Sequence, residues 1–225
     1  MKNMVRNKYS LKDIAGVRKD YKILDFIFYT RVSRYITFLL LYTKITPNQV
    51  TLLSLLFAII SSFFFLQGTY IHLVFGAVFL QLAQIFDAVD GEIARVKKMT
   101  SEFGSFFDGA VSYVGYYLNI PAIAIGNYMI NHNPNVLIFA MFALANILLI
   151  SGLKFMFKVD VPNQKVGHQI HLTKRLIVGG FSTYIFVLGL GAILNQTYYT
   201  LLFLAIAGAL IWIRQFYSYY KLCKN

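Results

Sequence analysis

Six apolar stretches in this sequence are long enough, or nearly long enough, to cross a lipid bilayer, which needs roughly 17–25 mostly apolar residues in a helix. They are Val50–Gln67, Ile71–Phe86, Phe106–Ile130, Asn135–Leu153, Leu176–Leu194 and Tyr198–Ile213. The second and sixth are short, and we expect them to continue through Asp87–Arg95 and Arg214–Tyr219. Pro121 lies inside the third and is expected to kink it. The sequence therefore predicts an all-α integral membrane protein with six transmembrane helices.

The basic residues all fall on one side of these predicted spans. Of the 21 Lys and Arg residues, ten precede the first span, three follow the second, five surround the loop between the fourth and fifth, and three close the chain. Because basic residues concentrate in cytoplasmic loops, we expect both termini to be cytoplasmic. We also expect the chain to be a multi-pass protein of the cell (plasma) membrane. This bias explains the net charge of +12 without a nucleic-acid partner, for which we find no motif.

The first 48 residues differ from the rest of the chain. Residues 23–43 are apolar but are interrupted by Asp25, Arg31 and Arg34, so no uncharged segment there is long enough to span. This pattern is typical of an amphipathic helix in the membrane interface. Thr46 and Pro47 then mark a new helix start, since proline suits the first helical position. We divide the chain into a cytoplasmic lead with an interfacial helix, residues 1–48, and a six-helix transmembrane domain, residues 49–225.

Three aspartates lie at the predicted cytoplasmic ends of the second and third spans. Asp87, Asp90 and Ala94 have the i, i+3, i+7 spacing of one helix face, and Asp108 faces them if the two spans form an antiparallel hairpin. Carboxylates in apolar helix ends are costly and are functional candidates. A divalent cation would remove their mutual repulsion, and oxygen ligands favour Mg²⁺, Mn²⁺ or Ca²⁺ over zinc. The alternative is a set of solvated charges paired with the neighbouring cations Arg95, Lys97 and Lys98.

These residues also resemble a known family signature. The segment reads Asp87-x2-Asp90-Gly91-x2-Ala94-Arg95-x8-Gly104-x3-Asp108, which resembles the signature of the CDP-alcohol phosphotransferases (CDP-alcohol phosphatidyltransferases). The resemblance extends upstream to the segment Thr46-Pro47-Asn48-Gln49-Val50-Thr51. It covers the chain to about residue 115, while the carboxyl-terminal half is similar only in its hydropathy. It implies six spans, an interfacial N-terminal helix and a homodimer.

The resemblance implies a metal-dependent enzyme of phospholipid synthesis. Such enzymes transfer a phospho-alcohol group from a CDP-alcohol, here expected to be a CDP-linked lipid, to a second alcohol and release CMP. Asp87, Asp90 and Asp108 would hold Mg²⁺ or Mn²⁺ in up to two sites. The residues implied to bind the CDP-alcohol are Asp87, Asp90, Gly91, Ala94, Arg95, Gly104 and Asn48.

One position departs from the family pattern. The signature ends with a fourth aspartate, implied to act as general base and second-metal ligand, and this sequence has Ser112 there. A serine hydroxyl is no base near neutral pH and is a weak metal ligand, so the second metal site is expected to be weakened. Three explanations stay open: a variant that uses another base, a non-catalytic lipid- or nucleotide-binding relative, and an engineered substitution. Glu92 and Glu102 are poor substitutes, because Glu92 points off the Asp87–Asp90 face and Glu102 lies in the loop.

A basic cluster suggests where an acceptor could bind. It comprises Lys154, Lys158, Lys165, His168, His171, Lys174 and Arg175. Lys154, Lys174 and Arg175 are the candidates to grip a phosphorylated acceptor such as an inositol or glycerol phosphate, and the alternative is ordinary topology anchoring. A transporter is a less suitable interpretation, because the charges lie at the membrane edge and no internal repeat appears.

Overall fold

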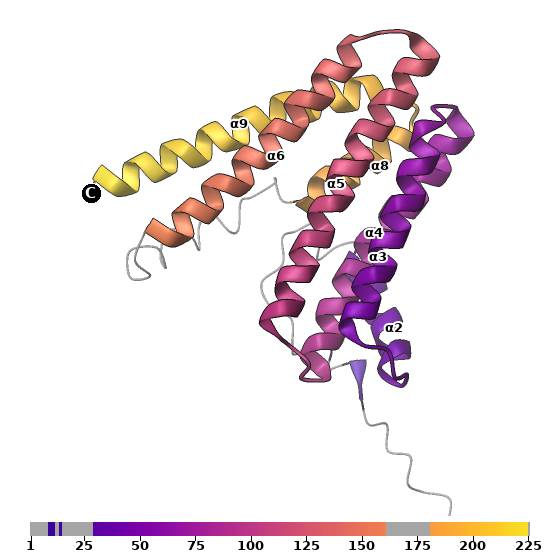
Figure 1. Ribbon diagram of the computed structural model, residues 1–225, viewed down its shortest axis with the longest axis vertical. Coiled ribbons are helices and arrows are strands. Elements are labelled where there is room, and N and C mark those ends of the chain that lie inside the picture. Colours follow the sequence, from indigo (N-terminus) through magenta and orange to yellow (C-terminus); the bar gives the residue numbers. More distant parts are fainter. Residues whose placement is uncertain (1–8, 12–13, 15–28, 161–180, 225) are drawn as a thin grey trace, which may run out of the picture.

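The computed structural model describes residues 9–11, 14, 29–160 and 181–224, and the regular structure in these ranges is entirely helical (Figure 1). The helices are α2 (Thr30–Leu41), α3 (Pro47–Leu66), α4 (Tyr70–Val96), α5 (Glu102–Asn131), α6 (Asn135–Asp160), α8 (Phe181–Ile193) and α9 (Thr197–Lys224). The predicted all-α class is confirmed for these residues. Helix α2 lies within the segment predicted as interfacial, and its depth in the membrane stays a prediction.

Four helices, α3, α4, α6 and α9, are long and apolar enough to cross a membrane. Helix α5 has 30 residues, but its Tyr and Asn side chains make it less apolar. Helix α8 is apolar and is described over 13 residues; residues 176–180, where the fifth predicted span begins, lie outside the described part. The chain is therefore a multi-pass membrane protein, and the count of six spans stays a prediction.

Helix starts and extensions follow the sequence closely. Thr46 caps α3 in a reciprocal capping box with Gln49: the Thr46 amide donates to Gln49 Oε1 at 2.9 Å, and the Gln49 amide donates to Thr46 Oγ1 at 3.4 Å. At the start of α5, Ser101 Oγ accepts a hydrogen bond from the Gly104 amide at 2.9 Å. Helix α4 continues to Val96 and α9 to Lys224, so both predicted extensions are confirmed.

Helix α3 organises the amino-terminal half of the bundle. It packs along α4 and along α5, whereas α4 and α5 touch each other only sparsely. The second and third predicted spans, α4 and α5, are therefore joined mainly through α3, which supplies the surface on which both pack. Helices α2 and α8 pack on α4. Helices α6 and α9 pack against each other and diverge from the other helices toward the carboxyl terminus of α9 (Figure 1).

Two features hold this packing together. A side chain at Gly126 of α5 would collide with the carbonyl oxygen of Phe65 in α3, so glycine permits the close helix approach that is common in membrane bundles. The buried apolar side chains form a large cluster that includes Phe65 and Leu80. A smaller cluster surrounds Val50 and Val89, and it supports the acidic end of α4.

Candidate active site

The structure brings the three signature aspartates together where α4 ends and α5 begins. The carboxyl groups of Asp87 and Asp108 are close enough to interact directly. Asp90 lies one helical turn beyond Asp87, and its carboxyl group is close enough to feel the charges of both. The one-face spacing on α4 thus produces a cluster, although α4 and α5 are not a tight pair. We call Asp87, Asp90 and Asp108 the carboxylate cluster.

Ser112 faces this cluster. Its hydroxyl donates a hydrogen bond to Asp87 Oδ1 at 2.7 Å, while Gln84 Nε2 donates to Asp87 Oδ2 at 3.2 Å. Each Asp87 oxygen therefore has one protein donor. Since Ser112 follows Asp108 by four residues, both side chains leave the same face of α5.

Asp90 is held from a third helix. Its side chain is 2% exposed, and its Oδ2 accepts a hydrogen bond from the Thr51 hydroxyl of α3 at 2.5 Å. The sequence motif included Thr51 but assigned it no role. Nothing in the sequence links Thr51 to Asp90, because the two residues are 39 positions apart and lie on different helices.

The neighbouring cations are used in different ways. The guanidinium of Arg95 lies over Gly91, where an added Cβ would be 3.0 Å from Nη1, and its charge acts on Asp108. Arg95 Nε is buried and has no hydrogen-bond partner among the described residues. Lys97 Nζ instead donates to the carbonyl oxygens of Thr43 and Ile45, each at 2.9 Å. Lys97 is therefore committed to the α2–α3 connection, and Arg95 is the cation whose charge acts on the cluster.

The remaining nucleotide-binding candidates lie around the same corner. An added Cβ at Gly104 would be 3.5 Å from Asn48 Oδ1, so the first turn of α3 meets the first turn of α5. Gly91 and Ala94 are partly exposed on α4. The predicted residues from three segments therefore converge on one end of the bundle.

Comparison with known proteins agrees with this geometry. The sequence profile of the CDP-alcohol phosphatidyltransferases matches residues 44–219. The chain belongs to this family. All of the residues in the carboxylate cluster, together with Asn48, Arg95 and Gly104, lie inside the matched region.

Individual relatives of this family member share only part of their length with it. The bifunctional IPC transferase and DIPP synthase of Thermococcus kodakarensis is 33% identical over 122 residues, which are 54% of this chain and 26% of that protein. The archaetidylinositol phosphate synthase of Pyrococcus horikoshii is 31% identical over 83 residues, 36% of this chain and 42% of that one. The chain thus matches less than half the length of these curated relatives.

A solved structure shares the fold. The crystal structure of Mycobacterium tuberculosis phosphatidylinositol phosphate synthase with CDP-DAG bound superposes with a TM-score of 0.64. The superposition covers 83% of this chain and 92% of the mycobacterial chain, and the two sequences are 18% identical. The likeness supports the helical arrangement of the chain over most of its length.

The carboxylate cluster has the donor chemistry, but among the described residues not the compact geometry, of a site for a hard divalent cation. Among the described residues, no three His, Cys, Asp or Glu side chains already form a compact ligand group. The cluster nevertheless offers carboxylate oxygens from two helices, and these repel one another with Arg95 as the nearby compensating charge. Carboxylate oxygens with a net negative charge suit Mg²⁺ or Mn²⁺.

The two glutamates do not join the cluster. Glu92 is 1% exposed and accepts hydrogen bonds from two hydroxyls of α2, Ser33 Oγ at 2.9 Å and Thr37 Oγ1 at 2.6 Å. It points off the Asp87–Asp90 face, as predicted, and connects α2 to α4. Glu102 is exposed in the first turn of α5.

The acceptor candidates are not placed by the structure. Lys154 belongs to α6, but its side chain is outside the described part. Lys174 and Arg175 lie in residues 161–180, which are also outside it. Their role stays a prediction.

Proposed function

We propose that this chain transfers the phospho-alcohol group of a CDP-linked lipid to the hydroxyl of a second alcohol and releases CMP. The observation that carries the proposal is the gathering of Asp87, Asp90 and Asp108 beside Arg95, inside the region that matches the family. The choice of a CDP-lipid is supported by the CDP-DAG in the similar crystal structure.

The residues have distinct roles in this scheme. Asp87, Asp90 and Asp108 would hold Mg²⁺ or Mn²⁺, which when bound screens the charge of a pyrophosphate and stabilises the leaving phosphate. Arg95 offers its buried Nε and guanidinium to a donor phosphate. Asn48, Gly91, Ala94 and Gly104 line the nucleotide site. In the transfer, the acceptor oxygen bonds to the lipid-side phosphorus, the bond from that phosphorus to the CMP oxygen breaks, and the acceptor hydroxyl loses its proton.

Ser112 bears on where that proton goes. Its own proton is donated to Asp87 Oδ1, and a serine cannot accept another proton near neutral pH. We infer that the proton of the acceptor hydroxyl passes to water or to a less effective base than an aspartate at position 112, and that turnover is slow. The same hydrogen bond favours a second candidate function: a family member that binds a CDP-lipid without turning it over.

The acceptor that we propose is a phosphorylated polyol. The names of two similar proteins contain inositol phosphate, so inositol phosphate is the first to test and glycerol phosphate the second. Lys154, Lys174 and Arg175 are the residues proposed to bind its phosphate. We further propose that the protein is a homodimer in the cell membrane, with the site on the cytoplasmic side.

The deciding experiment measures CMP release by the purified full-length chain. Assays contain CDP-DAG, inositol phosphate or glycerol phosphate, and Mg²⁺, Mn²⁺ or EDTA. Release that requires both metal and acceptor supports the transferase. Metal-dependent CDP-DAG binding without release supports the binding protein. Neither binding nor release with any of these substrates would contradict both.

A further inference from the structure

Helix α3 faces α4 with three buried hydroxyl side chains. Thr51, Ser54 and Ser61 lie on one face of α3, and all three hydroxyls donate hydrogen bonds to α4. Ser54 Oγ donates to the Ala83 carbonyl oxygen at 2.9 Å, and Ser61 Oγ donates to the Gly76 carbonyl oxygen at 2.8 Å. Hydrogen bonds of this kind join helices inside a membrane.

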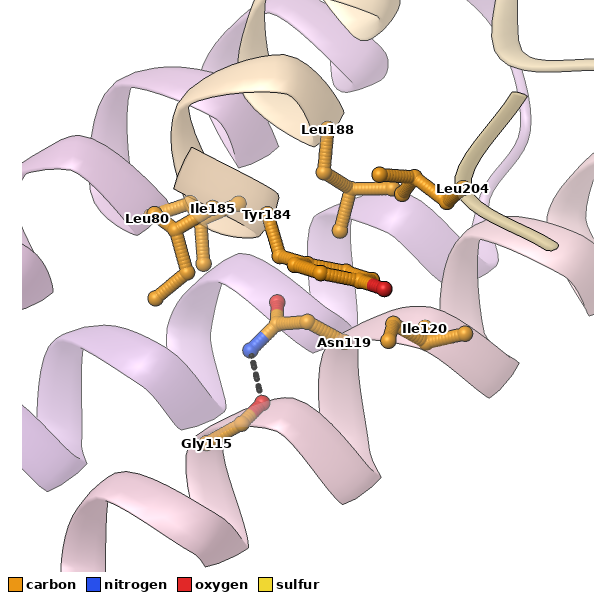
Figure 2. Close-up of a pocket in the computed structure, with 8 residues that line it drawn as sticks. All are labelled: Leu80, Gly115, Asn119, Ile120, Tyr184, Ile185, Leu188 and Leu204. Carbon is orange, nitrogen blue, oxygen red and sulfur yellow. Dashed lines mark hydrogen bonds between the residues drawn. The ribbon is translucent and has the colours of Figure 1, made fainter. Parts of the chain in front are cut away.

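Helix α3 is also hydrogen-bonded to α5. Asn119 Nδ2 of α5 donates to the Ala58 carbonyl oxygen of α3 at 3.2 Å. It also donates to the Gly115 carbonyl oxygen of its own helix at 2.8 Å, which is the bond drawn in Figure 2. Asn119 lines a small cavity whose other walls are mostly aliphatic, with Leu80 and Leu204 among them. These contacts end on main-chain carbonyl oxygens, so they fix the spacing of the helices and involve no ionisable group.

Thr51 makes a different kind of contact. Among the described residues, it makes the one hydrogen bond from α3 to a side chain of another helix, because its hydroxyl donates to Asp90 Oδ2 at 2.5 Å. Both side chains are 2% exposed, so bulk water does not compete for the bond. The packing that aligns Ser54 with a main-chain carbonyl of α4 therefore aligns Thr51, one turn earlier, with a carboxylate of the cluster.

The direction of the Thr51 hydroxyl is set by its own helix. Its Oγ1 lies 3.1 Å from the carbonyl oxygen of Pro47, one turn earlier in α3, as in the threonine rotamer that turns the oxygen toward the preceding turn. A hydroxyl has a single proton to donate. A hydrogen bond to a carboxylate is stronger than one to a neutral carbonyl, so the proton is donated to Asp90.

We propose that Thr51 is a positioning residue of the active site, which fixes the direction of the Asp90 carboxylate relative to α3. The charges of Asp87 and Asp108 repel that carboxylate, and the hydrogen bond from Thr51 opposes its rotation away from them. Helices α4 and α5 touch only sparsely, so α3 is the element that can set the geometry between them. The inference rests on the proposed function, because Asp90 is one of the residues proposed to hold Mg²⁺ or Mn²⁺.

The first test measures Mn²⁺ binding by the detergent-solubilised full chain, from the electron paramagnetic resonance signal of free Mn²⁺. Thr51→Val keeps the shape of the side chain and removes the donor. Losing a hydrogen-bond partner of a metal-binding side chain typically weakens metal binding about 10–100-fold, so we expect the Mn²⁺ affinity to fall at least about 10-fold. Thr51→Ala should show the same loss. Thr51→Ser, which keeps the hydroxyl, should bind Mn²⁺ nearly as tightly as the unmodified chain.

Ser54→Ala is the matched control. It removes a buried hydrogen bond between the same two helices, one turn away from Thr51. It should lower the thermal midpoint and leave the Mn²⁺ affinity unchanged. Equal Mn²⁺ affinity in Thr51→Val and the unmodified chain would overturn the positioning role, and so would an equal loss of affinity in Ser54→Ala.

The second test is made in EDTA and depends on no metal. In an Asp90→Ala background, the Thr51 hydroxyl has lost its carboxylate partner. Thr51→Val should therefore shift the thermal midpoint less in that background than in the unmodified chain. Equal shifts in the two backgrounds would overturn the link between Thr51 and Asp90. Absence of Mn²⁺ binding by the unmodified chain would instead contradict the proposed metal site, so the two failures are distinguishable.

Discussion

Ser112 is directed at Asp87 and not at lipid, so an aspartate introduced there would enter the carboxylate cluster. General-base help is worth about 10²–10⁴-fold in rate, and a fourth carboxylate would also complete a second metal site. We therefore expect Ser112→Asp to raise the rate of CMP release by about 10²-fold or more, while nucleotide affinity in calorimetry changes little. Ser112→Ala is the control. Rapid turnover by the original chain, undiminished in Ser112→Ala, would show that another base acts.

Asp87 offers the clearest test of metal binding. Asp87→Asn keeps the size of the side chain. Its amide oxygen can accept from Gln84 while its NH₂ group donates to the Ser112 hydroxyl, so the fold should persist. It removes a charge from the cluster, and we expect metal-dependent binding of CDP-DAG to fall below detection in titration calorimetry. Glu102→Gln is the control, because Glu102 is exposed outside the cluster. Equal binding by Asp87→Asn and the original chain would contradict a metal site at Asp87.

At the scale of the helix, α2 is joined to α4 through buried hydroxyls. Thr37 and Ser33 are both 0% exposed and donate to the Glu92 carboxylate. Hydrogen bonds to charged groups contribute about 1.5–3 kcal/mol. We expect Thr37→Val, which keeps the side-chain shape, to speed hydrogen exchange throughout Thr30–Leu41. Thr43→Val, at an exposed hydroxyl that bonds to the Leu40 carbonyl, should leave exchange in α2 unchanged, and equal effects of the two would contradict the link.

Local signals predicted most element boundaries. Thr46 and Pro47 predicted the start of α3, and the i, i+3 spacing of Asp87 and Asp90 placed both on one face of a continuous α4. What the sequence could not predict depends on contacts between distant residues. Thr51 and Asp90 are 39 residues apart, and Ser33 and Glu92 are 59 apart. Helix α5 also packs mainly on α3, and no periodicity distinguishes that choice from pairing with α4.

At the scale of the whole molecule, the charge pattern predicts the orientation of the chain in the membrane. All 21 basic residues fall on one predicted side, so the connection Asn131–Asn135 should face the outside. A cysteine at Asn133 in a Cys223→Ser background should react with a membrane-impermeant maleimide added to intact cells. The unmodified chain, with Cys223 near its basic end, is the control and should react only after permeabilisation. Labelling of position 133 from the cytoplasm alone would refute the topology.

The length of α4 determines how deep in the bilayer the carboxylate cluster lies. Counted from Tyr70 at 1.5 Å per residue, Asp87 lies about 26 Å and Asp90 about 30 Å along the helix axis, and the hydrocarbon core of a bilayer is about 30 Å thick. If Tyr70 lies at one boundary of the hydrocarbon core, the carboxylates of Asp87 and Asp90 lie at the opposite boundary, next to the layer of lipid phosphates. A lipid-linked donor could then present its phosphorus without rising from its leaflet, and a soluble acceptor could arrive from water without entering hydrocarbon.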